Sequence, residues 1–176
     1  ILGLTINDWV EEHFFNITAI AVSLIVGGIA IILIENYAGK SQRIKEVEKI
    51  DFKTAVKIGI IQCLSMIPGT SRSGATIMGA LVSGVDRKVA AEFSFFLAIP
   101  TIIGASALSL YKSWSSIDAS AIDLILIGGV VSFLVALVVV NGMIGFVSRN
   151  GFAPFAYYRI IAGAVILLSC SNYSGG

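Results

Sequence analysis

The stretch of sequence that decides the fold reads Pro68-Gly69-Thr70-Ser71-Arg72-Ser73-Gly74. It separates two apolar runs, residues 55–67 and 75–85, and each is shorter than the roughly 20 residues that a helix needs to cross a bilayer. Proline disfavours helical geometry at the residue before it, so the first run should end there, and Ser71 or Ser73 can cap the second. The sequence therefore predicts a helix–loop–helix hairpin over residues 54–86.

The whole chain has the composition of a membrane protein. Its 176 residues are 56% hydrophobic and 13% charged, whereas a soluble domain carries about 25% charged residues. Four apolar stretches approach or exceed the length of a membrane-spanning helix: residues 17–34, 93–111, 124–147 and 154–173. These runs lack the polar alternation of outer-membrane strands. We therefore expect an all-α polytopic membrane protein, with membrane lipids as neighbours and no nucleic-acid partner.

The short hairpin should be re-entrant, returning to the side of the membrane from which it starts. Non-helical backbone at membrane depth is tolerated only where protein or a water-filled cavity satisfies its amides, and broken helices of this kind mark binding sites. Ala75, Gly79 and Ser83 lie four residues apart and give the second arm a small-residue face for close packing. We predict four transmembrane helices plus one re-entrant hairpin.

Charge predicts how the chain is oriented in the membrane. Five of the twelve Lys and Arg residues fall in the linker 36–53, which the positive-inside rule places in the cytoplasm. Gln42 then lies inside and Ser115 outside. Arg149 and Arg159 also fall on the inner side, and Arg159 is close enough to the start of its helix to snorkel toward the headgroups.

Arg72 is the residue that most needs a partner, because a guanidinium near the bilayer centre costs about 2.5–3.5 kcal/mol on insertion scales. Its planar donor fork matches phosphate oxygens, and the start of a helix attracts anions. The alternative is that Arg72 pairs with a carboxylate elsewhere in the bundle. We interpret the loop as a phosphate-binding site, built from Thr70, Ser71, Arg72, Ser73, Gly74 and Thr76.

Two other ionisable residues have simpler interpretations. His13 lies just before an apolar stretch and is expected to be a solvated interfacial residue. Glu92 is four residues after Lys88, near a helix start, which favours a local ion pair or cap. Neither is assigned a chemical role.

Two long strings carry a resemblance to a known family. Residues 62–77, which read QCLSMIPGTSRSGATI, resemble the second signature of the undecaprenyl-pyrophosphate phosphatase (bacitracin-resistance) family, and residues 91–100, AEFSFFLAIP, resemble its following helix. The resemblance extends from about residue 17 to the C-terminus. It implies an inverted-repeat fold, in which two re-entrant hairpins meet at mid-membrane, and this chain resembles the second half of that fold.

The resemblance also implies how the chain is divided. Residues 1–35 would hold an N-terminal segment and the last helix of the first repeat, and residues 36–53 would be a cytoplasmic linker. The second repeat would take 54–176, with helices at about 89–111, 121–147 and 154–173. The chain is therefore expected to begin within a longer protein.

By the same resemblance, the function is hydrolysis of undecaprenyl pyrophosphate to undecaprenyl phosphate and inorganic phosphate. The reaction would serve the external leaflet of a bacterial plasma membrane, recycle the cell-wall carrier lipid and confer bacitracin resistance. Ser71, Arg72 and Thr76 would be the catalytic residues of this half. The family's first signature, with glutamates, a serine and a histidine, has no match here, so the chain should be inactive without the N-terminal half.

The resemblance brings in Mg²⁺ or Ca²⁺ as a cofactor, although no carboxylate lies in this signature to hold a metal, and it allows a homodimer. An alternative function is half of a lipid or small-solute transporter, because broken helices at the midplane are also transporter architecture. The histidine-dependent lipid phosphatases are rejected, because no histidine follows Arg72.

Overall fold

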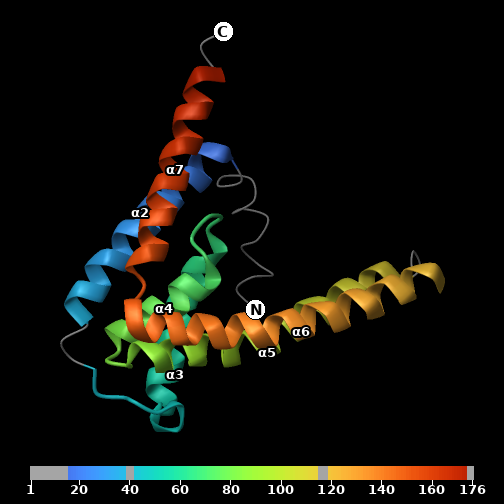
Figure 1. The fold of residues 1–176 in the computed structure, drawn as a ribbon, viewed down its shortest axis with the longest axis horizontal. Coiled ribbons are helices and arrows are strands. Elements are labelled where there is room, and N and C mark those ends of the chain that lie inside the picture. Colours follow the sequence, from blue (N-terminus) through green and yellow to red (C-terminus); the bar gives the residue numbers. More distant parts are fainter. Residues whose placement is uncertain (1–15, 39–41, 115–118, 174–176) are drawn as a thin grey trace.

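The protein is described here by a computed structural model that covers residues 16–38, 42–114 and 119–173 (Figure 1). His13 and Ser115 lie outside these residues. The described part is helical apart from turns, loops and one isolated parallel bridge between Ile44 and Val85. Its elements are α2 (Ile17–Ala38), η1 (Val47–Lys49), α3 (Phe52–Gln62), η2 (Cys63–Met66), α4 (Arg72–Val82), α5 (Arg87–Ser113), α6 (Ala119–Asn150) and α7 (Ala153–Tyr173).

Four of these helices are long and apolar enough to cross a membrane, namely α2, α5, α6 and α7. The prediction of four long apolar helices is confirmed. Helix α5 begins earlier than the charge-free stretch suggested, because the Asp86 side chain caps it by accepting a hydrogen bond of 2.9 Å from the Lys88 amide. The expected local pair is present as well, with Lys88 Nζ 3.7 Å from Glu92 Oε1.

Helices α3 and α4 form the two arms of a hairpin. Asp51 caps α3 by accepting from the Thr54 amide at 3.3 Å, and hydrogen bonding to Thr54 lowers the pKa of the Asp51 carboxyl. After η2 the chain turns to extended geometry at Ile67, with φ −71° and ψ 120°, as the following proline predicts. A Cβ on Gly79 would lie 3.1 Å from the Ile61 side chain, so the small-residue face of α4 allows its close contact with α3.

The outer ends of both arms meet at the linker. The carbonyl oxygen of Gly84, just after α4, accepts from the amides of Arg43 at 2.8 Å and Ile44 at 3.1 Å. The Asp86 amide donates in turn to the Ile44 carbonyl at 2.8 Å. Because the linker also leads into α3, the hairpin starts and ends at the same end of the molecule.

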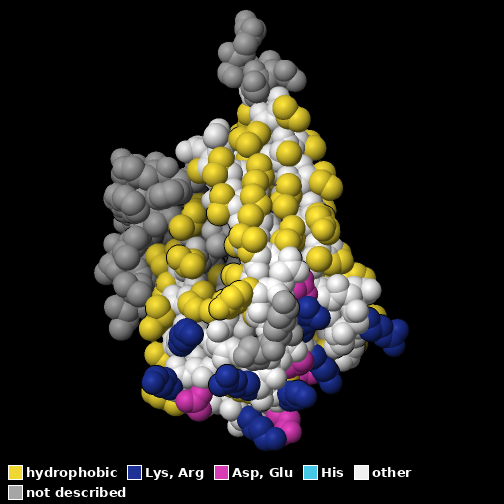
Figure 2. All heavy atoms as spheres, turned by 90° about the vertical axis from the view of Figure 1, so that its left-hand side faces the viewer, with side chains coloured by type: hydrophobic (Ala, Val, Ile, Leu, Met, Phe, Trp, Pro, Cys, Tyr) yellow, Lys and Arg dark blue, Asp and Glu magenta, His cyan; other side chains and the backbone are white. Residues whose placement is uncertain are grey.

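Helix α4 is the centre of the described structure. Every residue from Ala75 to Leu81 is buried, and α4 packs on α3, α5 and α2. Figure 2 shows that Lys and Arg side chains gather at one end of the molecule, below an apolar surface. The charged end and the apolar body agree with a chain that sits in a membrane with its basic linker at one face.

The long helices form two pairs that diverge (Figure 1). Helices α2 and α7 pack side by side along their lengths, and Gly28 and Gly163 make room for the backbone carbonyls of Ala156 and Ala21. Helices α5 and α6 form the other pair, which projects away, and in the described part of α6 only the end near Val147 is buried, whereas its most apolar stretch is not. The four helices therefore do not form one parallel bundle, and the hairpin lies between the pairs.

A buried carboxylate joins three helices at the charged end. Both oxygens of Glu35, near the end of α2, accept from the Phe152 amide, at 3.0 and 3.1 Å. Glu35 Oε1 also lies 3.0 Å from Nε of Arg87, the first residue of α5. Gly151, with φ +68°, turns the chain into α7 where a Cβ would overlap that carboxylate.

Candidate functional site

The loop between the two hairpin arms has an unusual backbone. Gly69 adopts φ +88°, and Ser71, with φ +72° and ψ 119°, is the one non-glycine residue with positive φ among the described residues. Such a conformation costs on the order of 1–3 kcal/mol and persists only where its surroundings hold it, as they do at many functional sites. Residues 69–71 are therefore a strained turn that needs external support.

Ser71 is the N-cap of α4, and it is one of the two residues that the sequence predicted as the cap. Its Oγ accepts from the Gly74 amide at 3.2 Å and lies 3.3 Å from Ser73 Oγ. The amides of Arg72 and Ser73 belong to the first turn of α4, where backbone donors have no acceptor within the helix. With the positive end of the helix dipole behind them, these donors suit an anion.

The Arg72 side chain extends from the start of α4 to α5. Its Nη1 donates to Thr101 Oγ1 at 2.6 Å, and that hydroxyl lies 2.8 Å from the Ala98 carbonyl, to which it donates. The ion pairs among the described residues join Lys49 to Glu46, Arg87 to Glu35 and Lys88 to Glu92, so none involves Arg72. A guanidinium has five N–H groups, and most of those of Arg72 therefore remain for a further acceptor.

Thr76 lies inside the hairpin, and its side chain is 1% exposed. Its Oγ1 is 2.9 Å from both Gln62 Oε1 and the Arg72 carbonyl oxygen. The hydroxyl thus ties the end of α3 to the start of α4. Thr70 faces another space, a cavity of about 300 Å³ between α2 and the hairpin with an almost wholly apolar lining.

Arg159 corrects the sequence-based expectation. It does not snorkel to the headgroups, because it is 9% exposed and its Nη2 donates to the Gly69 carbonyl at 2.8 Å and to the Ser23 carbonyl at 3.4 Å. The physical reason is that α7 packs against α2 around Arg159. The Arg159 side chain therefore contacts the hairpin loop rather than the membrane surface. A charge six residues inside an apolar helix is the signal that could have identified it.

Three of the predicted residues meet Arg159 around one cavity. Ser71, Ser73 and Gly74 line a space of about 210 Å³ together with Arg159, and the rest of its lining is apolar or aromatic, including Tyr158. Arg72, Thr76 and Thr70 do not line this space. The six predicted residues therefore share one loop and helix start, and three of them line this cavity.

The donor set at this loop consists of hydroxyls, amides and guanidinium groups. Divalent cations such as Mg²⁺ and Ca²⁺ prefer carboxylate and carbonyl oxygens, and the described residues contain no group of three or more His, Cys, Asp or Glu side chains placed to hold a metal. The residues at the loop do not fit a metal, and their chemistry is that of an anion site.

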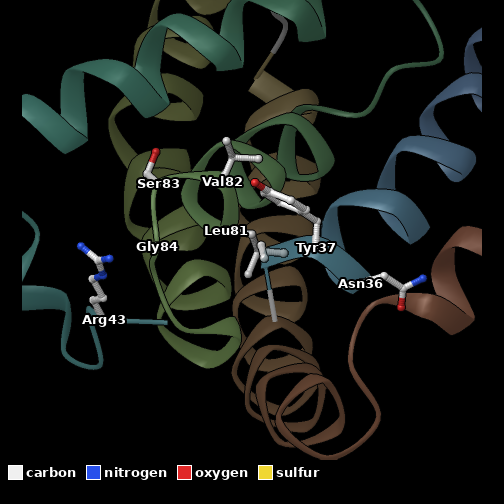
Figure 3. A pocket seen from close by; sticks show the side chains of 8 residues that line it. Asn36, Tyr37, Arg43, Leu81, Val82, Ser83 and Gly84 are labelled. Atoms are coloured by element: carbon white, nitrogen blue, oxygen red, sulfur yellow. The ribbon is translucent and has the colours of Figure 1, made fainter. Parts of the chain in front are cut away.

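A larger cavity, of about 600 Å³, opens at the other end of α4. Figure 3 shows Tyr37 and Arg43 facing it from α2 and the linker, beside Ser83 and Gly84. Since α4 has 11 residues, its two ends lie about 16 Å apart. This cavity is therefore separate from the loop.

The chain matches known proteins over nearly its whole length. A family model described as "Bacitracin resistance protein BacA" matches residues 1–165, beginning earlier than the resemblance expected from about residue 17. The chain is 49% identical to "Undecaprenyl-diphosphatase 2" of Paramagnetospirillum magneticum, over 94% of this chain and 63% of the relative. It is 55% identical to "Undecaprenyl-diphosphatase" of Sphingopyxis alaskensis, over 96% and 63%, and 54% identical to that of Rhizorhabdus wittichii, over 85% and 56%.

The chain thus spans about three fifths of the length of the curated relatives that it matches. The family model covers far more than half of the chain, and it includes both the hairpin and the strings that carry the resemblance. The chain therefore belongs to the BacA family of bacitracin resistance proteins.

Proposed function

We propose that the complete enzyme carrying this chain hydrolyses undecaprenyl pyrophosphate to undecaprenyl phosphate and inorganic phosphate. The observation that carries the proposal is the anion-suited start of α4, with Arg72 beside it, in a chain about half identical to several undecaprenyl-diphosphatases. Recycling of the carrier lipid and resistance to bacitracin would follow from this activity.

In this reaction the chain binds and positions the pyrophosphate. Phosphoryl transfer depends mostly on positioning and charge stabilisation, which the guanidinium of Arg72, the first amides of α4 and the hydroxyls of Ser71 and Ser73 supply. Water forms a bond to the terminal phosphorus, the bridging P–O bond breaks, and the bridging oxygen leaves with undecaprenyl phosphate. The groups that activate the water would come from the family's first signature, elsewhere in the complete enzyme.

The other predicted residues take supporting roles in this proposal. Thr76, held by Gln62, fixes the carbonyl of Arg72 and with it the start of α4. Gly74 keeps the helix start open to the phosphate, and Thr70 lies where the apolar cavity reaches the loop. Any Mg²⁺ or Ca²⁺ would be held by the substrate or by residues outside this chain.

We further infer that the hairpin is re-entrant and belongs to the second half of an inverted repeat. Each arm is an 11-residue helix, about 16 Å long against a hydrocarbon core of about 30 Å, and both outer ends meet at the basic linker. With the linker in the cytoplasm, the loop lies at membrane depth and serves substrate from the external leaflet of a bacterial plasma membrane.

This topology can be tested by cysteine labelling on intact cells. A membrane-impermeant thiol reagent should label a cysteine introduced at Ser115 and should not label one introduced at Gln42, both in a background in which Cys63 and Cys170 are replaced. Labelling at Gln42 alone would invert the orientation of the chain. Labelling at both positions or at neither would put them on the same side of the membrane and contradict the re-entrant hairpin.

The activity itself needs a test that separates hydrolysis from transport. Complete enzyme in liposomes should release inorganic phosphate from undecaprenyl pyrophosphate presented on one leaflet. Movement of the intact lipid pyrophosphate between leaflets without phosphate release would instead support the transporter alternative and overturn the proposal.

The chain alone gives a second test of the same proposal. Expressed by itself it should insert into membranes and release no phosphate, and co-expression with a segment carrying the family's first signature should restore release. Strong phosphate release by the purified chain alone would show that its own residues include the nucleophile or base.

A further inference from the structure

The contact between Arg159 and the hairpin loop joins three parts of the chain that are far apart in sequence. Arg159 belongs to α7, Gly69 to the loop and Ser23 to α2, and one guanidinium nitrogen donates to the backbone carbonyls of both partners. Backbone carbonyls are what a side chain would contact to fix the path of a loop, since such contacts do not depend on the partner's side chain.

Two neighbouring glycines leave room for the contact between Arg159 and the loop. A Cβ on Gly27, in α2, would overlap Nη2 of Arg159, so a side chain there would displace the guanidinium from its present position. On the other side, a Cβ on Gly69 would lie 2.7 Å from the Ile20 carbonyl oxygen, which places the loop directly against α2. The loop is therefore held between α2 and the head of Arg159.

The Arg159 guanidinium also has an N–H group that makes no hydrogen bond to the described residues. Its Nε is buried and has no acceptor among the described residues, although a buried donor without an acceptor is unfavourable. Arg159 lines the 210 Å³ cavity with Ser71 and Ser73. A residue kept for packing alone would not need to bury a charge with an unmatched donor beside these hydroxyls.

We propose that Arg159 is a positioning residue for the phosphate site. By fixing the Gly69 carbonyl, two residues before the strained Ser71, it holds the loop so that the start of α4 faces the phosphate. Arginine suits this role because Nη2 alone donates to both carbonyls and Nε is left for the cavity, whereas lysine has a single nitrogen. The kinetic consequence rests on the proposed phosphatase activity, and the structural one does not.

The kinetic test uses the complete enzyme with Arg159→Met and Arg159→Lys. Misplacing a reactive group by about 1 Å can cost up to roughly a hundredfold in rate, so kcat should fall about ten- to a hundredfold for both variants. KM should change much less, because the phosphate-contacting groups themselves remain. Gly129→Ala, at a position in α6 with nothing within 4 Å, is the matched control and should leave kcat and KM unchanged.

A double-mutant cycle separates the positioning role from general packing. Gly27→Ala alone should lower kcat as Arg159→Met does, because its methyl group displaces the guanidinium. In the Arg159→Met background the same substitution should add little, because the space has been vacated. Full additivity would mean that Gly27 matters for helix packing alone and would contradict the proposal.

The structural test does not need activity. A cysteine introduced at Thr70, in the background without Cys63 and Cys170, should react several-fold faster with N-ethylmaleimide when Arg159 is replaced by methionine, while the thermal unfolding midpoint shows that the protein is folded. Unchanged labelling together with wild-type kcat would overturn the proposal. If the wild-type enzyme released no phosphate, the proposed function would fail, and the labelling rates would still decide whether Arg159 holds the loop.

Discussion

The two pairs of long helices are both apolar, yet they have different surroundings. Helices α2 and α7 pack face to face through small residues and hold buried polar groups, Glu35 and Arg159. Helices α5 and α6 expose most of their apolar side chains, and their contacts with the hairpin come mainly from α5 near its start. The α2–α7 pair therefore supports the loop, whereas the outer part of the α5–α6 pair leaves an exposed apolar surface.

The largest stability effect should come from Glu35, in the supporting pair. Glu35→Ala leaves the Phe152 amide without its acceptor and Arg87 without its counter-charge. Breaking a buried pair costs about 3–5 kcal/mol, and because the Arg87 side chain is 38% exposed we expect about 2–3 kcal/mol. Unfolding measurements in detergent check this value.

The matched control lies in the other pair. Val138, on α6, is 74% exposed, so Val138→Ala should change the unfolding free energy by less than about 0.5 kcal/mol. If Glu35→Ala and Val138→Ala lowered the unfolding free energy equally, the proposed difference between the α2–α7 and α5–α6 pairs would be wrong. Glu35→Gln should recover part of the loss, because an amide oxygen can still accept from Phe152.

A smaller effect is expected at the strained cap of α4. Ser71→Ala removes the hydroxyl that accepts from the Gly74 amide and keeps the strain of a positive φ, so it should cost about 1 kcal/mol. Ser71→Gly removes the same hydroxyl but relieves the strain, and should therefore cost less. If glycine destabilised the hairpin more than alanine in unfolding experiments, the strained geometry of Ser71 would be wrong.

The smallest effect concerns the cap of α3, at the exposed charged end. The pKa of Asp51 is lowered from 3.8 by hydrogen bonding to Thr54. A carboxyl with a lowered folded-state pKa stabilises the fold above its unfolded-state pKa, and this contribution disappears as pH falls through the folded-state pKa.

The hairpin should therefore lose a little stability as the pH is lowered below about 4. Asp51→Asn can still cap the helix but does not titrate in this range. The difference in stability between wild type and Asp51→Asn should shrink on acidification. A difference that is independent of pH between 6 and 3 would contradict this assignment.

Local sequence chemistry predicted the hairpin well. Pro68 accounts for the extended geometry of Ile67 after η2, Ser71 caps the second arm and Gly79 packs against Ile61, because each feature depends on residues within one turn or one hairpin. The four long helices follow from hydropathy in the same way. The positive φ of Ser71 could not be predicted, because the sequence marks such geometry with glycine far more often.

Contacts between elements that are far apart in the sequence could not be predicted from it. Arg159 has an apolar helix on both sides of it, and nothing local indicates that α2 and the loop would enclose it. The partners of Glu35 lie 52 and 117 residues away, and the divergence of the two helix pairs depends on which faces meet. Such long-range geometry is set by packing rather than by local propensity.

The central claim is that Arg72 and the start of α4 bind the phosphate that is transferred. The most direct measurement is the turnover of the complete enzyme with Arg72→Ala, alongside Arg72→Lys and Thr76→Ala, each shown to be inserted and folded. Removing one preorganised donor costs about 10²–10³ in rate, so Arg72→Ala should lose at least that. Lysine should restore only a small part of it. Thr76→Ala should cost less, nearer the ~0.5–1.5 kcal/mol of a net hydrogen bond. A folded Arg72→Ala enzyme that turned over at the wild-type rate would contradict the phosphate site at this loop.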